Sequence, residues 1–182
     1  MITCKPDSCR GSPWIRWLRF RIRALLLVVA VSGLCLGIVH HRDRQQRLDR
    51  AILTAAHRGD AQAVRSLLEL GANANVVDGG PGFWRPLMHA ALHGDSGLVR
   101  ILLDRGAEID PQDGDGFTAL TIAAEEGHWD VVRLLASRGA DIDHRDATGL
   151  SALDRAAAGG ESGVVSFLEA TRRRPPSSSD RP

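Results

Sequence analysis

The middle of the chain lacks cysteine. The three cysteines of the sequence, Cys4, Cys9 and Cys35, all precede residues 48–170, so that segment cannot contain a disulfide bond. Cys4 and Cys9 lie close together but lack the third and fourth ligands of a structural zinc site, and we interpret them as unpaired thiols. The sequence therefore predicts a middle segment without disulfide bonds, and neither a metal nor another cofactor is expected.

Lysine is nearly absent, since the chain has 22 arginines and one lysine. Together with the many alanines and glycines, this composition suggests a GC-rich bacterial genome. The net charge is only +1 because segments of opposite sign cancel: residues 1–47 carry nine basic and two acidic side chains, residues 48–170 carry ten and nineteen, and residues 171–182 carry four and one. An acidic middle segment repels phosphate backbones, so no nucleic-acid partner is expected.

The longest apolar run is ALLLVVAVSGLCLGIV, residues 24–39. As a helix it spans about 24 Å, slightly less than a hydrocarbon core of about 30 Å. Ile22 and the aliphatic stem of Arg23 can extend it, and Trp14 and Trp17 suit the membrane interface. We therefore predict a transmembrane helix that acts as an uncleaved signal anchor.

Two alternatives to an anchor are open for residues 24–39. A cleaved signal peptide fits the basic flank and the small residues Ala30 to Ser32, and would release a secreted protein, although the run is longer than the usual apolar region of such peptides. A buried helix of a soluble domain would not normally be apolar on every face. Arginines are slightly more numerous before the run than after it. This predicts a cytoplasmic N-terminus and a C-terminal domain on the exported side, periplasmic in a bacterium.

A period of 33 residues runs through the middle segment. Gly94, Gly127 and Gly160 follow one another at that spacing, and Gly59 precedes Gly94 by 35 residues. Each of these glycines follows a pair of alanines and precedes apolar residues at helical spacing, such as residues 131–135. A fixed period of this size indicates stacked structural units.

Local signals predict two helices and a hairpin in each unit. Gly127 is placed to end a first helix, and Gly139 to end a second. Thr118 and Ser151 stand at helix N-caps, and Pro86 suits a first helical position. Because a single unit cannot bury its apolar face, neighbours must stack, and at least three units are needed. The predicted fold class is an all-α solenoid.

This frame resembles ankyrin repeats. It combines an Ala-Ala-x-x-Gly turn, a second helix of the type Val-Val-Arg-Leu-Leu and a closing Gly-Ala-Asp/Asn. The resemblance implies an ankyrin-repeat solenoid at residues 48–170, with four repeats at about 48–75, 76–110, 111–143 and 144–170. The flanking parts are a basic N-terminal segment (1–23), the membrane helix (24–39), a charged linker (40–47) and a tail of disordered composition (171–182).

Departures from the family pattern carry further expectations. The histidine of the Thr-Pro-Leu-His motif is replaced by Met88, Thr121 and Asp154, which predicts hairpins that are less firmly held. Residues 78–85 contain a two-residue insertion, and we expect this loop to project. Trp129 stands where the family often has leucine and is expected in the core.

Motifs of catalysis are missing from the sequence. Histidines and carboxylates are numerous, but none stands in a nucleophile elbow, a zinc-protease helix or a glycine-rich phosphate loop. His57 and His93 lie near equivalent sites of adjacent units, too far apart for joint metal ligation. We therefore expect no enzymatic activity and no small-molecule substrate.

The resemblance implies a domain that binds a protein partner through its concave face, which in the family consists of hairpin tips and exposed residues of the first helices. We interpret the protein as a membrane-anchored interaction module at the cell envelope. Alternatives are an immunity or inhibitor protein that neutralises an exported toxin or enzyme, and an accessory subunit of an envelope stress-response or transport complex. The candidate partner-binding residues are Phe83, Trp84, Arg85 and Phe117 on hairpins and His57, Arg58, His93, Glu125 and Glu126 at helix ends.

Trp84 is the preferred anchor among these candidates. It stands beside a Gly-Pro-Gly insertion that offers little local structure to bury it. Aromatic anchors with a nearby arginine, here Arg85, are favoured at interface hot spots.

Overall fold

The computed structural model describes residues 41–173 of the chain. The chain divides into two compact units, Met1–Gln45 and Gln46–Pro182, and the repeats lie in the second. Residues 41–57, which include most of the expected charged linker, are helical. The three cysteines and the proposed membrane segment lie outside the described residues. Within residues 41–173, no helix combines the length and the apolar character that crossing a membrane requires.

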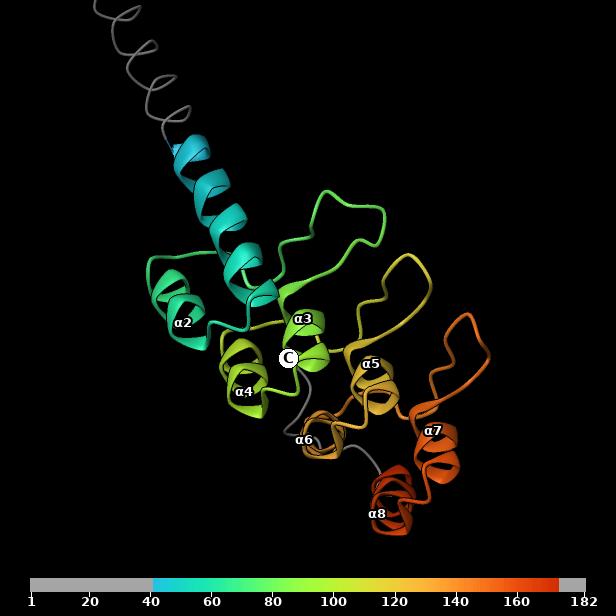
Figure 1. The fold of residues 1–182 in the computed structure, drawn as a ribbon. Helices are drawn as coiled ribbons and strands as arrows, with labels where there is room; N and C mark the ends of the chain where they lie inside the picture. The colour runs from blue at the N-terminus through green and yellow to red at the C-terminus, as the bar shows by residue number, and fades with distance from the viewer. Residues whose placement is uncertain (1–40, 174–182) are drawn as a thin grey trace, which may run out of the picture. The chain divides into compact units, whose positions relative to one another are not determined.

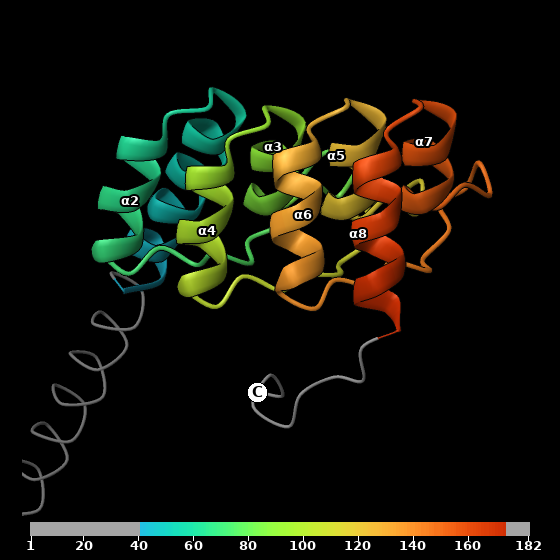
Figure 2. The ribbon, with the colours of Figure 1, turned by 90° about the horizontal axis from the view of Figure 1, so that it is seen from below.

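The repeat domain consists of helices in two rows (Figures 1 and 2). The first row contains helical residues 46–57 followed by α3 (Pro86–Leu92), α5 (Ala119–Glu125) and α7 (Ala152–Ala158). The second row contains α2 (Ala61–Glu69), α4 (Ser96–Asp104), α6 (Trp129–Ser137) and α8 (Ser162–Arg172). Residues 41–173 contain helices and turns but no β-strand. The predicted all-helical stack of four helix–turn–helix units is therefore confirmed.

Hydrogen bonds at the helix starts agree with the predicted caps. Thr118 and Ser151 are the N-caps of α5 and α7, and Pro86 opens α3. The side chains of Thr121 and Asp154 accept from the backbone N–H groups of Thr118 and Ser151 at 2.8 and 3.0 Å. These two side chains occupy the position of the missing motif histidine and close capping boxes. The expected loss of a hairpin tie is therefore wrong at Thr121 and Asp154.

Glycine ends every first helix of the stack. Gly94 and Gly127 have φ values of +69° and +74°, in the left-handed region where side chains are disfavoured. The backbone reverses at these residues, so the second helix of each repeat runs back along the first. Both predicted turns are confirmed.

The core lies between the two rows of helices. Ala90, Ala91, Ala123 and Ala124 are at most 3% exposed, and their small side chains let α3 and α5 pack against each other. The second row contributes the larger buried side chains, including Leu102 and Leu135 on α4 and α6. Trp129 is half-buried and packs against this core, as expected.

The C-terminal end differs from the sequence prediction. The expected tail begins at residue 171, but α8 continues through Arg172. No glycine stands at the closing position to end the helix, and Arg172 donates from Nε to Asp143 at 3.0 Å. Residues 174–182, the remainder of the expected tail, lie outside the described part of the chain.

Asparagine and aspartate side chains join each repeat to the next. Asn75 accepts a hydrogen bond from the backbone N–H of Glu108 at 2.7 Å, and Asp110 accepts from the backbone N–H of Asp141 at 3.1 Å. At the equivalent place in the third repeat, Asp143 accepts a hydrogen bond from the side chain of Arg172 at the end of α8, where the earlier repeats offer a backbone N–H. These loop residues form a ladder of acceptors along the stack.

Candidate protein-binding surface

Three loops project from the same side of the repeat domain (Figure 1). They follow α2, α4 and α6 at residues 70–85, 105–118 and 138–151, and we call them the hairpin row. The insertion in the first loop does project, and so do the other two loops.

An aspartate organises each hairpin. Asp78 accepts from the backbone N–H of Trp84 at 3.0 Å, and Asp113 accepts from that of Phe117 at 2.8 Å. Asp146 accepts from the backbone N–H of Thr148 at 2.7 Å. The sequence interpretation missed these three aspartates. The 33-residue spacing between Asp113 and Asp146 was a signal that could have revealed them.

Backbone hydrogen bonds connect neighbouring hairpins. The N–H of Gly114 donates to the carbonyl of Gly82 at 2.9 Å, and the N–H of Ala147 donates to the carbonyl of Asp115 at 3.1 Å. The three loops therefore form one continuous ridge. A ligand on this ridge meets residues that are already held in place, which reduces the entropy lost on binding.

The structure reverses the expected roles of Phe83 and Trp84. Trp84 is half-buried, packs against the core and lies 5.1 Å from the ring of His89. The expectation that nothing buries Trp84 is therefore wrong. It stands two residues before the first residue of its helix, as Phe117 does, and Phe117 is also half-buried. Phe83 is the aromatic residue that reaches solvent, with 58% of its surface exposed.

Phe83 also has an unusual backbone. Its φ of +52° makes it the only residue other than glycine with a positive φ among residues 41–173. A phenylalanine in this region is strained by roughly 1–2 kcal/mol. The loop thus holds an exposed aromatic ring in a conformation that glycine would adopt more easily.

Histidines join the first two repeats at the ends of the first-row helices. His93 donates from Nε2 to the carbonyl of His57 at 2.7 Å. His57 is exposed, and its ring lies 5.2 Å from that of His89 in an edge-to-face arrangement. His93, a candidate for partner binding, therefore also has a structural role. His128 makes the equivalent bond to the carbonyl of Leu92 at 2.9 Å.

His89 is a buried member of this cluster that the sequence interpretation missed. Only 7% of the residue is exposed, and its Nδ1 atom has no hydrogen-bond partner in the described part of the chain. Burial lowers the pKa of His89, and the neighbouring His57 lowers it further, while Asp78 acts in the opposite direction. His89 is therefore neutral at neutral pH and leaves a buried polar atom unsatisfied, which costs about 1–3 kcal/mol.

Replacing His89 by isoleucine should stabilise the domain and reduce its sensitivity to acid. Ile122 occupies the equivalent place in the next repeat, so the side chain fits this position, and the unsatisfied nitrogen disappears. Because the folded pKa of His89 lies below the ordinary 6.5, the unfolded chain binds the extra proton first. Stability should therefore fall as the pH drops through 6.5.

Urea denaturation at pH 7.5 and 5.5 measures both effects in the parent and in His89→Ile. We expect the variant to gain about 1 kcal/mol at pH 7.5 and to lose less stability at pH 5.5 than the parent does. His128→Leu is the matched control, because that histidine is hydrogen-bonded. Equal pH dependence in parent and His89→Ile would contradict the role of burial.

The other end of the surface centres on Arg155. Its side chain is 10% exposed, pairs with the fully buried carboxylate of Asp146 and lies 3.8 Å from Glu125. The guanidinium carbon lies 5.5 Å from the centre of the Phe117 ring. Burial alone would raise the pKa of Asp146, but hydrogen bonds from Thr148 and the charge of Arg155 outweigh it and hold this pKa below its usual value.

The remaining candidates lie apart from these two clusters. Arg85 forms an ion pair with Glu108 at 2.8 Å. Arg58 and Glu126 are exposed at the ends of first-row helices. No group of three or more His, Cys, Asp or Glu residues within 41–173 is arranged to hold a metal ion. The surface thus offers aromatic rings and charges on a preformed ridge, which suits binding to a protein.

Family comparison agrees with this architecture. The model of the family described as ankyrin repeats, with three copies, matches residues 29–113, 52–146 and 87–172. Together these matches include all the helices described above. No curated protein matches the sequence. The overlapping matches and the two rows of helices with projecting hairpins show that the chain belongs to the ankyrin repeat family.

Proposed function

We propose that the protein is a membrane-tethered interaction module that binds a protein partner through the hairpin row and the adjoining ends of the first-row helices. Ankyrin repeats suggest protein binding in general. The narrower proposal is supported by the rigid ridge of hairpins and by the exposed aromatic ring upon it. Its action is binding rather than catalysis, because the organised side chains of this surface serve to hold the hairpins.

Phe83 is the observation that carries the proposal. A strained backbone at an exposed side chain serves no purpose in packing, and such strain concentrates at binding and switching sites. The ring lies on a loop fixed through Gly82 to the next hairpin. Phe83 therefore replaces Trp84 as the proposed anchor of the partner, while Trp84 supports the loop from below.

Phe83→Gly should separate stability from binding. Glycine relieves the strained φ but increases the freedom of the unfolded chain, so we expect a net gain in stability of about 0.5 kcal/mol. Loss of the ring should weaken partner binding by about 2 kcal/mol or more, as removal of an aromatic anchor does. Thermal unfolding followed by circular dichroism checks the first effect. A variant that is destabilised by more than 1 kcal/mol would contradict the inference that the backbone of Phe83 is strained.

A photoreactive amino acid at position 83, in the full chain in its own cells, tests the proposed surface directly. We expect irradiation to attach one protein partner, identified by mass spectrometry. Placing the same group at Thr54, which is exposed within helical residues 46–57, provides the control. Identical products at both positions, or none at position 83, would overturn the proposal. The captured partner also distinguishes a toxin or enzyme inhibitor from an accessory subunit.

The membrane tether is proposed from the apolar run at residues 24–39. We infer that it is an uncleaved anchor with the repeat domain on the exported side. Protease added to spheroplasts should then digest the repeat domain while the cytoplasmic N-terminus stays protected. Digestion only after the cytoplasm is opened would contradict this orientation, and recovery of the intact domain in the soluble fraction would indicate cleavage.

A further inference from the structure

The repeat domain separates its charges between two sides. The second-row helices and their closing turns, residues 61–71, 96–106, 129–139 and 162–173, carry seven basic and four acidic side chains. The rest of residues 48–173 carries five basic and fifteen acidic side chains. The second row is therefore net positive in a domain that is otherwise strongly negative.

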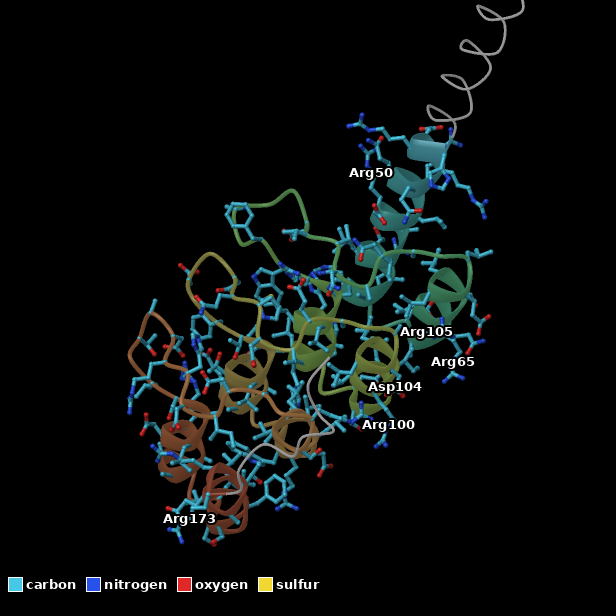
Figure 3. All side chains as sticks on the ribbon, turned by 180° about the vertical axis from the view of Figure 1, so that it is seen from behind. Arg50, Arg65, Arg100, Asp104, Arg105 and Arg173 are labelled. Carbon is cyan, nitrogen blue, oxygen red and sulfur yellow. The ribbon has the colours of Figure 1, made fainter. Side chains whose placement is uncertain are left out.

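Three arginines occupy the same position in successive second-row helices. Arg65 on α2, Arg100 on α4 and Arg133 on α6 each lie five residues after the N-cap of the helix. All three are exposed, and Figure 3 shows Arg65 and Arg100 pointing outward from their helices. Because α2 packs on α4 and α4 packs on α6, the arginines follow one another at roughly 8–10 Å. We call them the arginine row.

Carboxylates beside the arginine row are directed elsewhere. Glu69 and Asp104 lie one helical turn after Arg65 and Arg100, within the usual reach of an ion pair. Instead, Glu69 lies 3.9 Å from Arg105, and Asp104 lies 2.9 Å from Arg138 in the following repeat. Within residues 41–173, no carboxylate forms an ion pair with an arginine of the row. Three adjacent guanidinium groups are therefore available to an anionic ligand.

The spacing and the charges favour an acidic protein segment over a membrane surface. In an extended chain of the polyproline II type, which has three residues per turn, every third side chain lies on the same side of the chain at a separation of about 9 Å. This separation matches the row. An anionic leaflet would attract three arginines only weakly, about 1 kcal/mol each, and would repel the acidic remainder of the domain. A narrow acidic segment would contact only the arginine row and would not approach the acidic remainder of the domain. Its carboxylates can form bidentate hydrogen bonds with the guanidinium groups.

We propose that the arginine row is a second binding surface, which takes an extended acidic segment of a protein with a carboxylate at every third residue. This surface lies on the second-row helices and is separate from the hairpin row. The domain can thus hold two proteins at once.

Fluorescence anisotropy tests the proposal with the purified full chain in a non-ionic detergent. The probe is a labelled Ser/Gly peptide with glutamate at every third position, and the matched probe has glutamine at those positions. We expect the glutamate peptide to bind at least tenfold more tightly, with an affinity that falls as salt rises. Arg65→Gln, Arg100→Gln and Arg133→Gln should each weaken binding about threefold to tenfold, since each removes one charge-assisted pair.

Arg58→Gln is the matched control, because Arg58 is exposed and forms no ion pair within the described residues. It should change the affinity less than twofold. Equal binding of the two peptides, or equal losses in Arg58→Gln and Arg100→Gln, would overturn the proposal. Binding of the parent, but not of the triple arginine variant, to vesicles of anionic lipid without binding to the peptide would assign the row to a membrane. Phe83→Gly should leave peptide binding unchanged, so failure at this surface is distinguishable from failure at the hairpin row.

Discussion

Asp146→Ala should destabilise the repeat domain by about 3 kcal/mol, because it leaves the arginine that it neutralises buried and only partly paired. Arg155 has only 10% of its side chain exposed, and its remaining carboxylate, Glu125, is 3.8 Å away. The substitution also removes the acceptor of the Thr148 backbone N–H. Urea denaturation of the full chain, followed by circular dichroism, measures the loss.

Asp113→Ala is the matched control for this prediction. Asp113 organises its hairpin in the same way, with hydrogen bonds from the backbone N–H groups of Asp115 and Phe117, but among residues 41–173 it forms no ion pair with an arginine. We expect it to cost about 1 kcal/mol per lost hydrogen bond. If both variants lose the same stability, the buried ion pair adds nothing to the stability that the hydrogen bonds of the hairpin provide.

The pH dependence gives a second test of the same ion pair. Because the pKa of Asp146 is held below its ordinary 3.8, ionised Asp146 stabilises the domain above pH 3.8. That contribution is lost as the pH falls through the lower folded pKa. Asp146→Ala should therefore reduce the slope of stability against pH in this acidic range.

Gly94→Ala should cost about 3 kcal/mol, far more than alanine should cost at positive-φ glycines such as Gly139, where an added Cβ would meet no atom of the described residues. The φ of +69° already disfavours a side chain. In addition, a Cβ atom at Gly94 would lie 2.6 Å from Nδ1 of the His128 ring. That ring is fixed by its bond to the carbonyl of Leu92, so relief of the overlap would break the tie between repeats.

Gly139→Ala provides the comparison, because its φ is +93° but no atom of residues 41–173 lies within 4 Å of the added Cβ. It should cost only about 1 kcal/mol. The double variant Gly94→Ala/His128→Ala removes the overlap, so its loss should be smaller than the sum of the two single losses. Additive losses would show that the His128 ring does not cause the effect.

The sequence was sufficient for the fold because the signals of the fold are local and repeated. Paired alanines, turn glycines and cap residues such as Thr118 recur at one period, and each recurrence supports the others. The end of α8 was misplaced because no glycine marks it. The tie between Arg172 and Asp143 that accompanies the two additional residues of α8 joins residues far apart in the sequence.

The binding surface was predicted less well because it depends on contacts that the sequence does not display. Phe83 and Trp84 are neighbours in the sequence, yet one is exposed and the other rests on His89. The buried pair of Arg155 and Asp146 could not be distinguished from surface charges by composition. Both cases require knowledge of which side of the hairpin faces the first-row helices.

The ladder of Asn75, Asp110 and Asp143 bears on how such a protein can change in length. Each of these residues presents a hydrogen-bond acceptor to the following unit. A unit inserted by gene duplication would therefore donate to the acceptor of the preceding unit and present the same kind of acceptor to the next. The interior therefore places no limit on the number of units. The end of the stack is marked at the final rung, where the Arg172 side chain of the last unit takes the place of the backbone N–H that the other units present. Growth in evolution or by design is therefore expected to preserve the last repeat and multiply those before it.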